Sequence, residues 1–129
     1  LSDNVTSIAV HDGVRALISK KLIIRATLAV EDNEAVIPVI NVVDSYRRVT
    51  ADGSEIVPRS ELRIVQTPQI FAAELLRKAY EQPFDKSFTD DASVVEAMGH
   101  RISLVEGERA NLKLTTPEDL DWAEYYLAK

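Results

Sequence analysis

An acidic and a basic side chain follow the first apolar stretch of the chain. Asp12 and Arg15 come directly after Ser7–Val10, and Gly13 permits a sharp turn between them. A carboxylate and a guanidinium in such a loop could hold a metal ion and an anion. The same pair also fits a turn-stabilising aspartate and a solvated arginine, and the spacing alone favours that second interpretation.

A second candidate group, Thr89-Asp90-Asp91, precedes a helical pattern. A hydroxyl and the free N–H groups at a helix start can bind phosphate. However, two acids repel an anion, and a threonine N-cap followed by acids is an ordinary helix start. The residue types therefore favour Thr89 as a cap, and they favour helix capping over a Mg²⁺ site at the two aspartates.

A lysine near the C-terminus is a third candidate. Lys113 alternates with Leu112 and Leu114 on a short predicted strand, so it points away from the face that the leucines bury. A lysine in that place is normally solvated. On a strand that ends just before a capped helix, it can also reach a ligand at the edge of the sheet.

The composition narrows the classes of function. The 129 residues are 46% hydrophobic and 28% charged, which suits one globular domain or a large part of one. The absence of cysteine excludes disulfides, zinc-thiolate sites and a cysteine nucleophile, and it fits a reducing cytoplasm. A net charge of −6 argues against nucleic acid and anionic membranes as partners, and no apolar run is long enough to cross a bilayer. His11 and His100 are far apart in the sequence and indicate no metal site.

Predicted strands and helices alternate along the chain, and these elements must position the candidate side chains. The hydrophobic pattern predicts strands at 7–10, 35–39, 62–66, 101–105 and 112–114, and helices at 19–31, 71–79, 90–98 and from 117 onward. This alternation indicates an α/β protein with a mostly parallel sheet. Ligands of such sheets bind beyond the carboxyl ends of strands, and Asp12 and Arg15 follow such an end.

Helix starts and buried helix faces can also be predicted. Ser19 and Thr116 are expected N-caps, and Pro117 occupies the first position of the last helix. The expected buried faces consist of Phe71, Leu75 and Ala79 in one helix and of Leu120, Ala123 and Leu127 in the last.

A polar hairpin interrupts the alternation. Val43–Thr50 and Glu55–Val57 flank a turn with Asp52 and Gly53, and an Asp-Gly pair between two strand-like runs is a strong hairpin signal. We expect an arm at about residues 43–60 that projects from the main sheet. By default, its arginines Arg47, Arg48 and Arg59 protect a strand edge.

Short motifs span nearly the whole chain: Ala9–Arg15, Ile37–Val39, Val43–Ser45, Pro58–Ser60, Gln66–Phe71, Phe88–Ser93, Val105–Gly107 and Asn111–Thr115. In this order they resemble the methylerythritol phosphate cytidylyltransferase family. Two features depart from it. Ala16 stands where the family usually has proline, and nothing matches the glycine-rich loop whose arginine and lysine bind the CTP triphosphate. The chain thus resembles the C-terminal part, over residues 1–129, of one cytidylyltransferase domain with a Rossmann-like nucleotidyltransferase fold.

The resemblance implies a reaction. A nucleotidyltransferase of this family transfers CMP from CTP to 2-C-methyl-D-erythritol 4-phosphate, and it releases pyrophosphate and 4-diphosphocytidyl-2-C-methyl-D-erythritol. The family belongs to the non-mevalonate isoprenoid pathway, so a bacterial cytoplasmic enzyme is expected. Because the glycine-rich loop has no counterpart, the 129 residues alone are expected to be inactive.

The same resemblance assigns roles to individual residues. Asp12 is expected to hold Mg²⁺ or the CTP side of the substrates. Arg15, Thr67 and Thr89 are expected to contact methylerythritol phosphate, and Lys113 to stabilise charge at the α-phosphate.

The arm is expected to act across a homodimer. By resemblance, its Ser45 and Arg59 bind the methylerythritol phosphate of the neighbouring subunit, and serine keeps the hydroxyl of the threonine that is frequent in the family.

Other functions remain open from the sequence. A ribitol 5-phosphate cytidylyltransferase shares the fold and several motifs, although the run Thr89–Ser93 favours methylerythritol. A fusion to a later cyclase of the pathway is disfavoured, because the pattern ends in a helix at Lys129 without a linker. A non-catalytic fragment that only dimerises is the alternative outside the enzymes.

Overall fold

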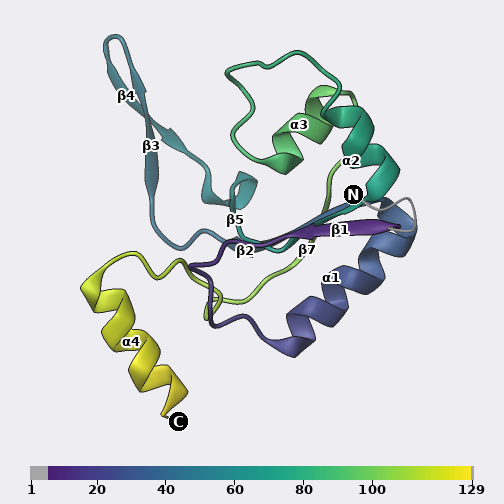
Figure 1. Ribbon diagram of the computed structural model, residues 1–129. Helices are drawn as coiled ribbons and strands as arrows, with labels where there is room; N and C mark the ends of the chain where they lie inside the picture. The colour runs from purple at the N-terminus through teal and green to yellow at the C-terminus, as the bar shows by residue number, and fades with distance from the viewer. Residues whose placement is uncertain (1–5, 129) are drawn as a thin grey trace.

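A five-stranded sheet with helices on both faces forms the body of the protein, in a computed structural model that describes residues 6–128 (Figure 1). The sheet strands are β1 (Ser7–Val10), β2 (Ala35–Asn41), β5 (Arg63–Val65), β6 (Gln69–Ala72) and β7 (Ser103–Glu106). The helices are α1 (Lys20–Asn33), α2 (Ala73–Ala79), α3 (Asp91–Ala97) and α4 (Pro117–Leu127). The arm consists of β3 (Tyr46–Thr50) and β4 (Gly53–Val57), and a 3₁₀ turn at Arg59–Glu61 follows it.

The strand directions of the sheet are mixed. β1, β2 and β7 share one direction, because β1 and β2 are both antiparallel to β6 and β7 is parallel to β2. These three strands therefore agree with the predicted, mostly parallel sheet. The segment β5–β6 runs against them and borders one side of β2, so β2 and β7 are the one parallel pair of neighbours among the described residues.

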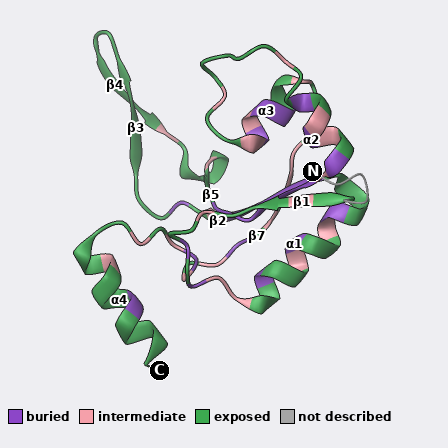
Figure 2. Cartoon of the chain, viewed as in Figure 1, coloured by how far each residue is buried: buried purple, intermediate pink, exposed green. Residues whose placement is uncertain are grey.

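Both faces of β2 are covered, which explains its unbroken apolar sequence. Alternate side chains of a strand point to opposite faces. Ala35, Ile37 and Val39 therefore pack with residues of α2 and α3, whereas Val36 packs with Ala26 and Val30 of α1. Figure 2 shows this buried band along the sheet and the inner sides of the helices.

The helix caps agree with the sequence in two places and differ in one. Ser19 caps α1 by accepting the N–H of Leu22, and Thr116 caps α4 by accepting the N–H of Asp119. The expected cap at Thr89 is wrong. Asp90 is the N-cap of α3, and its carboxylate and the Ser93 side chain form a capping box.

Two predicted elements also differ. Phe71 lies in β6 and not in a helix, and the buried residues of α2 are Ala73, Leu76 and Ala79. Residues 112–114 form no strand. The N–H of Leu114 donates to the carbonyl of Val14, in a loop, at 2.9 Å. β1 is a strand as expected, but most of its residues are exposed, because β6 is its one partner among the described strands.

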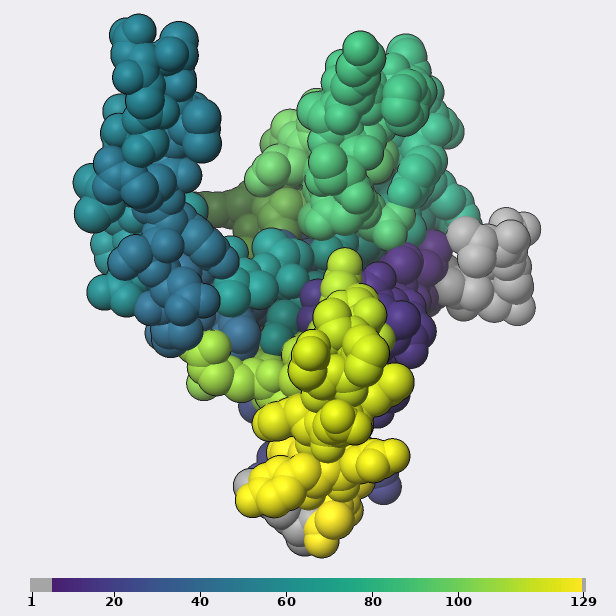
Figure 3. All heavy atoms as spheres, turned by 90° about the vertical axis from the view of Figure 1, so that its left-hand side faces the viewer, coloured from purple at the N-terminus to yellow at the C-terminus, as the bar shows by residue number. Residues whose placement is uncertain are grey.

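The arm and α4 both project from this body (Figures 1 and 3). β3 and β4 pair antiparallel from Tyr46 opposite Val57 to Thr50 opposite Gly53, which confirms the hairpin. In α4 the predicted buried face is wrong for two of its three residues, because Ala123 is buried while Leu120 and Leu127 are exposed. Within residues 6–128, no helix has the length and apolar character needed to cross a membrane.

Candidate active site

One cavity brings together side chains from distant parts of the sequence. It has a volume of about 450 Å³ and lies among the end of β1, the junction of β5 and β6, the start of α3 and the segment before α4. Five of the predicted site residues line it: Asp12, Arg15, Thr67, Thr89 and Lys113. The short separation in space explains how residues more than 50 positions apart can share a ligand.

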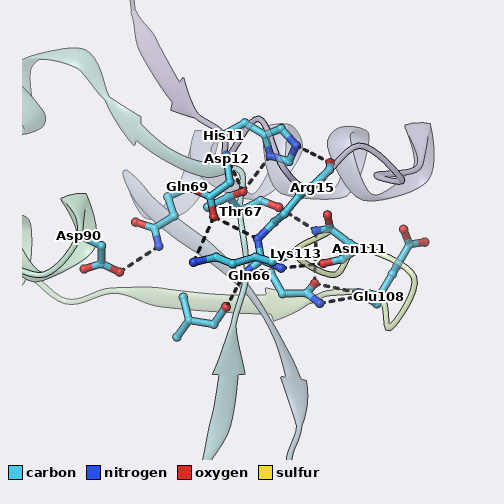
Figure 4. Close-up of polar contacts among 11 residues, drawn as sticks. His11, Asp12, Arg15, Gln66, Thr67, Gln69, Asp90, Glu108, Asn111 and Lys113 are labelled. Carbon is cyan, nitrogen blue, oxygen red and sulfur yellow. Dashed lines mark hydrogen bonds and ion pairs between the residues drawn. The ribbon is translucent and has the colours of Figure 1, made fainter. Parts of the chain in front are cut away.

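Asp12 is at the centre of the polar contacts in this cavity (Figure 4). Its backbone N–H donates to Oγ1 of Thr67 at 3.0 Å. Its Oδ2 accepts Nε of Arg15 at 3.2 Å and lies 3.9 Å from Nζ of Lys113. The Asp12 carboxylate therefore holds Arg15 by a charged hydrogen bond and lies close enough to Lys113 to attract its ammonium group.

Arg15 is buried, with 7% of its surface exposed, so the solvated arginine suggested by spacing is wrong. Besides its contact with Asp12, Nη1 donates to the carbonyl of Asn111 at 2.7 Å and Nη2 to that of Val65 at 3.3 Å. These contacts tie three chain segments together, as the forked donors of a guanidinium allow. Contact of Arg15 with a substrate stays a prediction.

His11 completes a chain of hydrogen bonds that the sequence did not reveal. Its Nδ1 lies 2.9 Å from Oγ1 of Thr67, and its Nε2 lies 3.0 Å from the carbonyl oxygen of Arg15. Because that carbonyl only accepts, Nε2 is the protonated nitrogen, and the Thr67 hydroxyl donates to Nδ1. In the sequence, the one indication of these hydrogen bonds is that His11 lies between a predicted strand and Asp12.

Asp90 and Asp91 line the cavity but already have structural partners. Asp90 accepts the N–H of Ser93 at 2.8 Å and Nε2 of the buried Gln69 at 3.0 Å. Asp91 accepts the hydroxyl of Tyr80, and this hydrogen bond raises the pKa of Tyr80 to about 12. Asp90 is thus the helix cap and Asp91 the acid of the first turn, as the residue types favoured over a metal site, while the exposed Thr89 lines the cavity beside them.

The two predicted arm residues do not join this cavity within the chain. Arg59 is exposed, and its Nη1 donates to the carbonyl of Val43 at 2.6 Å, which holds it at the base of the arm. Ser45 is also exposed and precedes β3. Neither residue lines the cavity that contains Lys113.

The donor set can hold a cation only in a limited way. No group of three or more histidine or acidic side chains suited to a metal lies within the described part of the chain. Asp12 offers one carboxylate at the cavity, with 39% of its side chain exposed. One carboxylate together with substrate phosphates is a common environment for Mg²⁺, so the residues fit an ion that arrives with a nucleotide.

Both the sequence and the fold of the chain match known proteins. A family model for 2-C-methyl-D-erythritol 4-phosphate cytidylyltransferase (IspD) matches residues 1–129. The chain belongs to this family. The resemblance seen in the sequence motifs is therefore confirmed.

Curated bacterial proteins with this family name are similar to the chain. The chain is 53% identical over 117 residues to the 2-C-methyl-D-erythritol 4-phosphate cytidylyltransferase of Phocaeicola vulgatus. The aligned region covers 91% of this chain and 53% of that protein. The chain is 51% identical over 127 residues to the enzyme of Bacteroides fragilis, with 98% and 58% covered. The chain thus spans little more than half the length of the curated relatives it matches.

Solved structures of the family share the fold. The cytidylyltransferase of Thermus thermophilus matches with a TM-score of 0.85 and 34% identity, over 98% of this chain and 64% of that one. The 4-diphosphocytidyl-2C-methyl-D-erythritol synthase of Anaerococcus prevotii matches with a TM-score of 0.89 and 31% identity, over 100% and 62%. These matches confirm the Rossmann-like α/β fold expected from the resemblance.

Proposed function

We propose that the protein containing this chain is an enzyme that transfers CMP from CTP to 2-C-methyl-D-erythritol 4-phosphate, in isoprenoid synthesis in the bacterial cytoplasm. Membership of the family supports the reaction class. The observation that carries the assignment to this chain is the gathering of Asp12, Arg15, Thr67, Thr89 and Lys113 around one cavity. The products are 4-diphosphocytidyl-2-C-methyl-D-erythritol and pyrophosphate.

The reaction needs positioning and charge neutralisation more than covalent chemistry. A phosphate oxygen of methylerythritol phosphate forms a bond to the α-phosphorus of CTP, and the bond from that phosphorus to the oxygen bridging to the β-phosphate breaks. Pyrophosphate leaves with the bonding electrons. We assign to Lys113 the stabilisation of negative charge on the α-phosphate, because its ammonium group is the more exposed of the two cavity cations.

The methylerythritol phosphate is assigned to the threonine side of the cavity. Thr67 and Thr89 offer hydroxyl groups at its wall. Arg15 contributes positive charge from a buried position, where the lower effective dielectric strengthens its attraction for an anion. This arrangement explains how a chain with a net charge of −6 can accept anionic substrates.

Asp12 is the residue proposed to bind Mg²⁺. Phosphate oxygens and water would complete the coordination of the ion, which neutralises charge on the phosphates when it is bound. Arg15 and Lys113 both approach Oδ2 of Asp12, so Oδ1 would be the oxygen of this carboxylate that stays available to an ion.

The arm is proposed to act in a homodimer. Ser45 and Arg59 lie outside the cavity of their own chain, and the projecting hairpin exposes 85% of Val49. Crossing to a second copy would cover such apolar groups and would bring both polar residues to the partner's substrate.

The direct test is an assay of the full-length protein for pyrophosphate release with CTP and Mg²⁺. Methylerythritol phosphate and ribitol 5-phosphate are compared as acceptors, and EDTA is added in a parallel reaction. We expect turnover with methylerythritol phosphate, little with ribitol 5-phosphate and none without the metal. A preference for ribitol 5-phosphate would replace the proposed substrate, and inactivity with both acceptors would remove the proposed function.

A further inference from the structure

We infer that Gln66 and Asn111 are positioning residues whose buried side chains fix the segment that carries Lys113. The inference rests on the proposed function of Lys113. Gln66 has 2% of its surface exposed and Asn111 has 0%. Buried amides generally find hydrogen-bond partners, and among the described residues every amide atom of the two side chains except Oδ1 of Asn111 has one. What these atoms bond to shows which segments they hold in place.

Gln66 joins the end of β5 to the loop after β7. Its Nε2 donates to the carbonyl of Glu108 at 2.8 Å, and its Oε1 accepts the N–H of the same residue at 3.2 Å. The fit is tight, because a Cβ at Gly107 would collide with Oε1 of Gln66. Gln66 also precedes Thr67, so one side chain links a proposed substrate residue to the loop that leads to Lys113.

Asn111 extends this link toward the catalytic segment. Its Nδ2 donates to the carbonyl of Thr67 at 2.8 Å and lies 3.4 Å from Oε1 of Gln66. The backbone carbonyl of Asn111 accepts a hydrogen bond from Nη1 of Arg15 at 2.7 Å. Gln66 and Asn111 therefore form one buried unit, here called the amide clasp, that contacts two polar residues of the cavity, Arg15 and Thr67, and the loop at Glu108 (Figure 4).

Lys113 depends on this clasp for its place. It lies two positions after Asn111, and on its other side the N–H of Leu114 donates to the carbonyl of Val14 at 2.9 Å. The lysine side chain itself is 55% exposed, with its ammonium 3.9 Å from Asp12. Because the side chain is loosely held, its backbone anchors determine whether the ammonium reaches the reacting phosphate.

A double-mutant cycle in the full-length enzyme tests the inference. Gln66→Met keeps the shape of the side chain and removes its hydrogen bonds. We expect kcat to fall roughly 10- to 100-fold, the size of loss that displacement of a catalytic group by about 1 Å can cause, with a smaller change in KM. When Lys113 is already alanine, the same change should alter kcat by less than about twofold, because residues that act through one another are not additive.

Gln82→Met is the matched control. Nε2 of Gln82 donates to the carbonyls of Ala79 and Val94, both at 2.8 Å, so it also ties two segments together. It lies outside the clasp and the cavity. This variant should change stability without a selective loss of kcat. Equal kcat losses in the two glutamine variants, or additive effects of Gln66→Met and Lys113→Ala, would overturn the inference.

Two further measurements cover other outcomes. If Gln66→Met does not fold, Gly107→Ala disturbs the clasp from the opposite side and should show the same loss of kcat through Lys113. Amide hydrogen exchange measures the integrity of the clasp independently of enzyme activity. In Gln66→Met the N–H of Glu108 should exchange faster, because it loses its acceptor, while the exchange rates of the α1 amides stay unchanged. Faster exchange at Glu108 with unchanged kcat would refute the positioning role. An inactive wild-type enzyme would instead refute the proposed function, and unchanged exchange in Gln66→Met would refute the clasp.

Discussion

At the scale of single residues, Lys113 is the most informative side chain. Its Nζ lies 3.9 Å from Asp12 at the cavity, and no core packing depends on its exposed side chain. In the full-length enzyme, Lys113→Ala should lower kcat by on the order of 10²–10³, the usual loss when one preorganised charge-stabilising group is removed. Steady-state kinetics with both substrates gives the measurement.

Lys78→Ala is a suitable control for this change, because Lys78 is an exposed lysine on α2 that does not line the cavity. It should retain wild-type kcat. The melting temperatures of both variants should stay close to that of the wild type. Near-normal kcat in Lys113→Ala would show that Lys113 is a solvated lysine without a catalytic role, as its spacing in the sequence suggests.

The residue scale also shows where sequence patterns mislead. Arg15 looked like a solvated charge, yet it is buried because carbonyls from 50 and 96 positions away accept its N–H groups. Thr89 looked like a cap, but the adjacent Asp90 takes that role through Ser93. Family motifs pointed to the cavity residues, whereas local spacing could not show partners so distant in the chain.

At the scale of elements, the capping box of α4 predicts a pH dependence. Asp119 accepts the N–H of Thr115 at 3.0 Å and that of Thr116 at 3.1 Å, and these bonds to the charged carboxylate lower its pKa. A lowered folded-state pKa means that the stabilisation of the helix start is present above the ordinary aspartate range. It is lost as the pH falls through the lowered pKa.

An NMR titration of the Asp119 carboxyl carbon measures this effect. In the folded full-length protein the midpoint should lie below the ordinary aspartate value of about 3.9, and in urea it should return to that value. Thr116→Ala should also destabilise the helix by about 1 kcal/mol, the usual cost of losing an N-cap. Identical midpoints in folded and unfolded protein would show that the capping box is absent in solution.

The arm gives a second prediction at this scale, which tests whether the site is shared. Lys113→Ala and Arg59→Ala should each be nearly inactive in the full-length enzyme. If the arm crosses between subunits, a mixed dimer places both lesions in one pocket and leaves the other pocket intact. Random mixing after unfolding and refolding should then restore roughly a quarter of wild-type activity, since half of the dimers are mixed and each has one intact pocket.

Mass spectrometry can confirm that mixed dimers have formed, and each variant refolded alone is the control. If mixed dimers show only the activity of the single variants, Arg59 belongs to the pocket of its own chain. That outcome would require the arm to fold back, away from the projecting position in Figure 1.

At the scale of the whole molecule, the chain of 129 residues should not catalyse the reaction alone. It has no counterpart of the glycine-rich loop that the family resemblance assigns to the CTP triphosphate. Its α4 also exposes 70% of Leu127, and α1 exposes Ile24 and Leu28, so apolar surface faces water. We expect the isolated chain to bind a hydrophobic dye and to release no pyrophosphate above a buffer blank.

The full-length enzyme, assayed in parallel, is the control for this prediction. Turnover by the isolated 129 residues well above the blank would show that the cavity residues described above suffice for nucleotide binding and transfer.

The sequence by itself determined most of the elements that form and the family to which the chain belongs. Apolar runs such as Ala35–Val39, the caps Ser19 and Thr116 and the Asp-Gly turn are local signals, and each predicted the element that is observed. Only the tertiary structure decided which side chains meet. The amide clasp, the burial of Arg15 and the reversed direction of β5–β6 depend on contacts between segments that are distant in sequence. The exposure of α4 has the same origin, because a helix buries an apolar face only where another surface covers it.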